Sequence, residues 1–176
     1  MMLQTEHLTL CPFSSKDEDA FFVGIEDTEL RRMYGLPEKL SRETAHRIFV
    51  QFSGLSTALS MVRRRDETMI GFLLDIPAEL PEPMLRTLPE GGRTLAFATF
   101  VPHRRQGYMR EAIAALIEQH SRAGDTPYLH GGHFPFNRPS QRLLAGLGFM
   151  LYGQHSVGTC TVIDEIRILQ GGSNDS

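Results

Sequence analysis

The chain has 176 residues, of which 41% are apolar and 22% are charged, and its net charge is −3. This is the composition of a globular domain of ordinary size, and it excludes a disordered or membrane-spanning chain. A small negative net charge also argues against a general nucleic-acid binder, whose basic surface would extend over the whole domain. Two cysteines, Cys11 and Cys160, make no disulfide framework and favour a reducing compartment.

The first residues lack a basic segment followed by an apolar run, and no apolar stretch approaches the roughly 20 residues of a membrane span. We therefore expect a cytoplasmic protein that contacts no membrane. Residues 3–10 partly alternate and predict a strand. Residues 14–27 place serines and acids ahead of apolar side chains, the order expected where a helix begins. Residues 41–54 predict a second helix, capped by Ser41.

Residues 58–76 contain two apolar runs separated by a charged turn near Asp66, which predicts a hairpin. The three arginines beside this turn, Arg63 to Arg65, are expected on a solvated face. Residues 77–92 are rich in proline and predict an irregular loop that ends in a glycine turn. This loop is long for a connection and could cover an acceptor site or contact a second subunit.

The second half begins with an apolar strand at 93–101 and an amphipathic helix at 108–123. A strand interrupted by two glycines follows at 126–134. A short helix at 137–148 has Asn137 as its cap and a Schellman ending at Gly148. Two closing strands then surround a turn near residues 156–158. The order of elements predicts an α/β (α+β) fold with a mixed central sheet.

The segment HRRQGYMREAIAALIEQH begins at residue 103 and places basic side chains and Gly107 directly ahead of a helix. The amide groups at a helix start, with the positive end of its dipole, attract anions. Gly107 would let a ligand approach the backbone, and the guanidinium groups of Arg104 and Arg105 could grip a phosphate. The alternative is an ordinary turn with solvated arginines. The loop is neither a P-loop nor a dinucleotide-binding glycine loop.

A second motif follows one strand later. Asn137 and Ser140, with the triplet Leu147-Gly148-Phe149, match the Asn-x-x-Ser and Leu-Gly-Phe signature of one branch of the GNAT superfamily, the acyl-CoA-dependent N-acetyltransferases. The segment Arg104 to Met109, followed by REAIAAL, resembles that superfamily's phosphate loop. The likeness covers nearly the whole chain and is greatest to the branch that acetylates the N-termini of ribosomal proteins.

This resemblance implies a single domain over residues 1–170. The last residues, 171–176, are expected to form a disordered tail. The resemblance implies about seven strands and about four helices, with the sheet splayed between its fourth strand, 93–101, and its fifth, 126–134. It also implies acetyl-CoA as co-substrate and no metal. The backbone of the loop would hold the pyrophosphate, the end of strand 93–101 would hydrogen-bond the pantetheine arm, and Ser140 would protonate the departing thiolate. The residues expected at the coenzyme are Thr99, Phe100, Val101, Arg104, Arg105, Gln106, Gly107, Tyr108, Met109 and Asn137.

Four positions depart from the family pattern. Arg105 replaces the first glycine of the loop and Met109 its small last residue. The tyrosine that many members use as general acid falls on Leu144, and the glutamate base of the branch, near Thr94, is absent. A helix cap remains the alternative role for Ser140.

Three histidines, His103, His130 and His133, are the nearest titratable substitutes for the missing base. A water chain would need no single essential residue. His130 and His133 should lie on opposite faces of their strand, which argues against a shared metal.

The reading we favour is transfer of acetyl from acetyl-CoA to a primary amine, either a protein N-terminus or a small amine. Two others stay open: a catalytically weak CoA-binding regulatory or interaction module, and an unrelated α/β module that binds a nucleotide phosphate at Gly107. The amine would be bound by the two early helices and the 76–92 loop, where Glu26, Asp27 and Glu29 could attract a cation. The closing strands could pair edge to edge in a homodimer, although nothing in the sequence requires it.

Overall fold

The computed structural model describes residues 2–169, so the predicted tail at 171–176 lies outside the described residues. These residues form two compact units. Unit 1 comprises residues 2–74 and 97–112, and unit 2 comprises residues 75–96 and 113–169. Over the described range, no helix is both long enough and apolar enough to cross a membrane. The prediction of one domain over 1–170 stays a prediction.

In unit 1 the strands follow one another as antiparallel neighbours in the order β1, β2, β3, β4. The predicted first strand is two strands, because the chain turns at residues 5–7 and β1 pairs back on β2. The predicted hairpin is confirmed as β3 and β4, with Glu67 at a φ of 53° in its turn. These strands are β1 (Leu3–Gln4), β2 (Leu8–Pro12), β3 (Ala58–Arg63) and β4 (Thr68–Pro77), of which β4 ends in unit 2.

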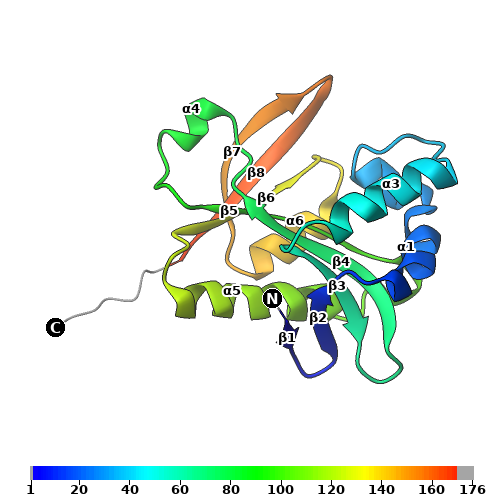
Figure 1. Ribbon diagram of the computed structural model, residues 1–176. Helices are drawn as coiled ribbons and strands as arrows, with labels where there is room; N and C mark the ends of the chain where they lie inside the picture. The colour runs from blue at the N-terminus through cyan, green and yellow to red at the C-terminus, as the bar shows by residue number, and fades with distance from the viewer. Residues whose placement is uncertain (1, 170–176) are drawn as a thin grey trace. The chain divides into compact units, whose positions relative to one another are not determined.

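The helices of unit 1 cover an aromatic core. The segment predicted as one helix at 14–27 contains a 3₁₀ turn, Ser15–Asp17, and helix α1, Glu18–Ile25. A new helix, α2 (Thr28–Met33), then begins because the Asp27 carboxylate accepts a 2.7 Å hydrogen bond from the Leu30 amide. Helix α3, Arg42–Ser53, is capped by Ser41 as predicted. Figure 1 shows α1 and α3 close together, and ring contacts there join Phe13, Phe21, Phe22, Phe49, Phe52 and Phe72.

In unit 2 the strands run in the order β5, β6, β8, β7 (Figure 1). The pair β5 and β6 is parallel, whereas β8 pairs antiparallel with both β6 and β7, so the sheet is mixed as predicted. The parallel pair is joined only at Arg93↔Leu129 and Thr94↔His130. The expected splay between these strands is therefore present. Their bounds are β5 (Arg93–Thr99, entering unit 1 at residue 97), β6 (Tyr128–His133), β7 (Met150–Val157) and β8 (Cys160–Ile168).

The predicted loop at 77–92 contains a short helix, α4 (Glu82–Leu85), whose start is pre-set by prolines at residues 81 and 83. Helix α5 spans Tyr108–Ala123, as predicted, and its first turn belongs to unit 1. Helix α6, Arg138–Gly146, ends in the predicted Schellman motif, in which the Phe149 amide donates to the Leu144 carbonyl. The described residues thus hold eight strands and six α-helices, one strand and two helices more than expected.

Candidate functional site

The loop ahead of α5 lies in unit 1 and leaves its backbone open. A 3₁₀ turn, Val101–His103, leads into it, and the Glu111 amide donates back to the Gly107 carbonyl at 3.0 Å. Gly107 has a φ of 83°, and a Cβ built on it would meet nothing within 4 Å. The backbone at Gly107, directly ahead of α5, therefore adjoins open space, as a site for an anion at a helix start requires.

Arg105, at the position of the family's first loop glycine, has a φ of 60°. Non-glycine residues rarely adopt this left-handed conformation, so the backbone keeps the shape that the glycine would give. The Arg105 side chain is exposed, and within residues 2–169 it has no partner. Met109 is buried in the core, so its bulk points away from the loop.

Arg104 uses its guanidinium group inside the chain. Its Nε donates to the Thr99 carbonyl at 3.1 Å, and its terminal nitrogens donate to Glu29 at 2.7 Å and to Asp27 at 3.3 Å. Arg104 thus ties the loop to the end of β5 and to helix α2. Two of the three acids expected to attract a cationic amine, Asp27 and Glu29, are paired with this arginine instead. Of the two arginines proposed to grip phosphate, only Arg105 presents a free guanidinium.

The turn near Asp66 contacts the same loop, and one of the arginines beside it does not lie where the sequence predicted. Arg63 does not lie on a solvated face: it is buried and donates to both carboxylate oxygens of Asp66, at 2.9 and 2.6 Å. This hydrogen bonding is the main cause that lowers the pKa of Asp66 to about 2. Arg63 also lies 3.4 Å from His103 Nδ1. Burial first, and then the charge of Arg63, lower the pKa of His103.

In unit 2, where β5 and β6 part, a buried chain of hydrogen bonds crosses one face of the sheet. The Thr94 hydroxyl accepts from the Glu79 amide at 2.8 Å, so its own proton is directed to His130 Nδ1 at 2.9 Å. His130 Nε2 then donates to one oxygen of Asp164 at 3.1 Å. His155 Nδ1 lies 2.8 Å from the other oxygen of Asp164. The position of the missing glutamate is therefore the start of a four-residue chain.

Asp164 is fully buried, and the two histidines keep it ionised. Burial, the largest influence, raises its pKa, but the hydrogen bonds and charges of His130 and His155 together lower the pKa below its usual value. Because Nδ1 of His155 donates to this carboxylate, Nε2 is the nitrogen left to accept a proton. The His155 side chain is 20% exposed. This is the arrangement of a histidine base held by a carboxylate.

His155 was not among the site residues predicted from the sequence. The signal was present, because with the hairpin turn at Gly158 the register places Asp164 opposite Gly153, diagonally across from His155 on the same face. The histidines that were predicted as substitutes for the missing base have other roles. Both ring nitrogens of His130 have partners, and those of His133 lie 2.9 Å from Glu165 and 3.0 Å from the Phe134 carbonyl.

His130 and His133 bond to different acids on opposite faces of β6, as the alternation predicts. Among residues 2–169, no cluster of three or more His, Cys, Asp or Glu side chains could hold a metal ion.

Helix α6 presents Ser140 with an unused hydroxyl. Asn137 caps the helix by accepting from the Ser140 amide at 3.2 Å, as predicted. The Ser140 hydroxyl itself is half-buried and makes no cap, and no partner for it is found in the described part of the chain. Leu144, at the family's tyrosine position, is fully buried, and its methyl groups would lie 2.9 Å from a Cβ at Gly131. Gly131, the first glycine of the Gly131–Gly132 pair, thus lets α6 pack closely on β6.

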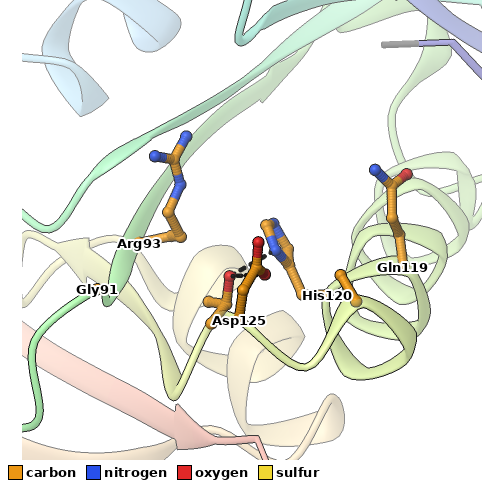
Figure 2. A pocket seen from close by; sticks show the side chains of 7 residues that line it. Gly91, Arg93, Gln119, His120 and Asp125 are labelled. Atoms are coloured by element: carbon orange, nitrogen blue, oxygen red, sulfur yellow. Dashed lines mark hydrogen bonds between the residues drawn. The ribbon is translucent and has the colours of Figure 1, made fainter.

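A pocket of about 290 Å³ lies elsewhere in unit 2, beside the last turn of α5 (Figure 2). Its walls include Arg93, His120 and Thr126, which are joined through Asp75 and one another. The Asp75 carboxylate lies 2.9 Å from both Arg93 Nε and His120 Nε2, and His120 Nδ1 lies 2.9 Å from the Thr126 hydroxyl. Both ring nitrogens of His120 are therefore occupied. The remaining lining residues are Gly91, Gln119, Ala123 and Asp125.

Comparison with known proteins agrees with these features. A family model described as an acetyltransferase (GNAT) domain matches residues 7–150. A GNAT-family acetyltransferase from Bacillus anthracis superposes with a TM-score of 0.80 at 15% identity, covering 96% of this chain and 98% of that one. No curated protein matches the sequence significantly.

Two other solved structures are ribosomal-protein acetyltransferases. The ribosomal L7/L12 α-N-protein acetyltransferase RimL, in complex with coenzyme A, gives a TM-score of 0.72 at 16% identity, over 96% of this chain and 98% of that one. The ribosomal-protein-S5-alanine acetyltransferase from Vibrio fischeri gives 0.66 at 17% identity, over 96% and 97%. At these identities the likeness shows the fold. The family model, which spans most of the sequence, shows the family: the chain belongs to the GNAT acetyltransferases.

Proposed function

We propose that this acetyltransferase transfers the acetyl group of acetyl-CoA to a primary amine, either a protein N-terminus or a small amine. The observation that carries the proposal is the chain from Thr94 to His155. It starts where β5 and β6 part, and it ends on β7 in a partly exposed imidazole whose Nε2 has no hydrogen-bond partner within residues 2–169. A primary amine needs such a base, since its nitrogen loses a proton when it attacks the thioester carbonyl.

In this proposal the backbone amides from Arg104 to Met109 bind the coenzyme pyrophosphate. The open space beside Gly107 supports this placement, as does the loop's position directly ahead of α5. The peptide groups of Thr99, Phe100 and Val101 hydrogen-bond the pantetheine arm. Arg104 contributes by holding Thr99 and the loop in place rather than by contacting phosphate itself.

In this proposal two side chains of unit 2 carry out the proton transfers that the reaction requires. His155 Nε2 accepts the proton that the amine nitrogen loses as the new C–N bond forms. The Ser140 hydroxyl donates a proton to the sulfur as the C–S bond breaks, and regains one from solvent. Asp164 keeps the His155 ring oriented and stabilises its protonated form.

A matched pair of glycine variants tests the coenzyme placement. Gly107→Val and Gly124→Val replace glycines at the two ends of α5, with φ of 83° and 71°, and each has open space around its Cβ. Both variants should lose similar stability. Calorimetry with acetyl-CoA should show loss of binding only for Gly107→Val. Equal affinity in the two variants, or binding of ATP but not acetyl-CoA by the wild type, would refute the placement.

A catalytically weak CoA-binding module remains the second function, because both the family glutamate and the tyrosine are absent, at Thr94 and Leu144. Release of CoA across a panel of amines and N-terminal peptides separates the two. Tight acetyl-CoA binding without any CoA release would favour the module. The cytoplasmic location and the homodimer stay predictions. The dimer prediction gains support from the exposure of Met150 and Leu151 on β7, the last strand in its sheet order.

A further inference from the structure

Helix α2 in unit 1 buries an arginine that has no counter-charge. Arg31 is 8% exposed, and its Nε is buried without a hydrogen-bond partner. Neither an ion pair nor a ring contact involves this side chain anywhere in residues 2–169. A guanidinium group stays charged at any ordinary pH, and taking it out of water without an anion is costly. Two other arginines of unit 1 differ, because Arg104 and Arg63 both pair with acids.

Two further polar atoms of unit 1 are also buried and make no hydrogen bond of normal geometry within the described chain. The Tyr34 hydroxyl lies one turn after Arg31, and helical spacing puts residues i and i+3 on the same face. The Tyr34 ring packs on Phe72, at 5.7 Å between centroids. Ser60, whose hydroxyl is the third such atom, is paired directly with Phe72 and so shares its face. Unsatisfied donors gathered on one face indicate a place for a polar ligand.

The position of this face relates it to the coenzyme segment of unit 1. The Tyr34 hydroxyl lies against the backbone of Phe97, two residues before Thr99. Burial raises the pKa of Tyr34 far above its usual range, with the Phe97 backbone opposing this effect, so the hydroxyl keeps its proton and can donate. Arg104 ties α2 directly to Thr99 and to the loop. The Tyr34 hydroxyl thus lies beside the β5 segment proposed to hold the pantetheine arm.

We infer that Arg31 and Tyr34 bind a carboxylate of the acceptor, so that the substrates of this acetyltransferase are amines that carry an acidic group. The inference rests on the proposed function and adds the substrate class. A guanidinium group matches the planar geometry of a carboxylate, and a phenol hydroxyl can donate to its second oxygen. Asp27 and Glu29 are taken by Arg104 and do not compete for Arg31.

The test compares acceptors in matched pairs: peptides with a free N-terminus that differ only by Asp or Asn, and amino acids against their amides. Wild type should acetylate the carboxylate member with a kcat/KM roughly 10- to 100-fold higher, the value of a charge-assisted hydrogen bond. Arg31→Met should reduce this ratio to about 1, and Arg31→Lys should retain part of it. The matched control is Arg32→Met, which removes the neighbouring exposed arginine and should keep the ratio.

Other readouts separate this inference from the proposed function. If wild type acetylates no amine, the proposed function fails, and calorimetry with the N-acetylated Asp and Asn peptides still tests the site. Tighter binding of the Asp product, lost in Arg31→Met, would support the inference.

Thermal unfolding adds a check that needs no ligand. Arg31→Met should have a Tm no lower than wild type, because it removes an unpaired buried charge. Three results would overturn the inference. The first is an equal ratio of kcat/KM between the paired acceptors in wild type and Arg31→Met, and the second is a markedly lower Tm for Arg31→Met. The third is a higher KM for acetyl-CoA in Arg31→Met with an unchanged acceptor ratio, which would make the coenzyme phosphates the occupant.

Discussion

Unit 2 contains two buried aspartates that differ in how their hydrogen-bond networks end. Asp75 bonds to Arg93 and His120, and the His120 ring continues to the Thr126 hydroxyl. Asp164 bonds to His130 and His155. In the first network both nitrogens of the outer histidine are occupied. In the second, His155 keeps one nitrogen available and is partly exposed.

The two networks show that an aspartate–histidine pair can either stabilise the fold or hold a histidine ready for catalysis. A histidine bonded to a buried carboxylate can act as a base only if its other nitrogen can reach a substrate. The Asp75 network joins the end of β4, the start of β5 and the last turn of α5, and so stabilises the fold. The pocket beside this network does not change that assignment, because Arg93 and His120 in its wall are both bonded to Asp75.

The largest expected effect is on turnover. His155→Asn keeps a side-chain amide able to donate to Asp164 but removes the basic Nε2, so kcat should fall by about 10²–10⁴-fold with little change in Tm. His120→Asn is the matched control and should lower Tm while each folded molecule keeps its turnover. Steady-state kinetics and thermal unfolding of the two variants measure this difference. If His120→Asn loses turnover and His155→Asn does not, the two networks have been assigned the wrong way round.

The second effect is on stability. Asp75→Asn leaves Arg93 and His120 without their buried counter-charge, which should cost about 3–5 kcal/mol of unfolding free energy. Denaturant unfolding of the variant measures the loss, and acetyl-CoA binding by the folded fraction should be unchanged. A loss within 0.5 kcal/mol, roughly that of an ordinary surface substitution, would contradict the structural role of this cluster.

A smaller effect concerns the dependence of the unfolding free energy on pH. Burial, the largest influence, raises the pKa of Asp75, but hydrogen bonds from His120 and Arg93 together lower the pKa below its ordinary 3.8. A carboxyl whose pKa is lower when folded contributes stability above the unfolded pKa and loses it as pH falls through the folded value. Unfolding free energy should therefore decline below about pH 4, and less steeply in Asp75→Asn. Parallel declines in both proteins would show that other carboxyls govern acid stability.

Turnover should also respond to Ser140→Ala. The hydroxyl makes no helix cap, so the variant should keep its Tm and its acetyl-CoA affinity while kcat decreases. An equal loss of stability with normal turnover would instead make Ser140 a structural residue.

Much of the fold could be predicted because the capping residues and the spacing of apolar residues agreed with the structure. Asn137 and Gly148 bound α6 as their capping preferences predict, and the period of apolar residues gave α5 its limits. Helix α2 was missed because Asp27 was taken as the end of the first helix and not as the cap of a new one. The helix inside the 77–92 loop was missed because prolines were taken as breakers, although two of them sit at its first turn.

The site was less predictable, since its chemistry depends on partners far apart in sequence. Arg104 has the sequence context of a phosphate ligand, yet acids some 75 residues away take its guanidinium group. His155 has no motif around it, and only the hairpin register brings it to Asp164. Arg31 stands next to another arginine in a polar helix, and only its burial distinguishes it.

The most direct measurement is mass spectrometry of acceptors incubated with acetyl-CoA and either wild type or His155→Asn. Each primary amine is paired with the alcohol of the same skeleton. We predict N-acetylated product from the amines with wild type, no acetylation of the alcohols, and at least a hundredfold slower reaction with His155→Asn. Acetylated alcohols, or equal rates for the two proteins on the same amine, would contradict amine acetylation through the Asp164–His155 pair.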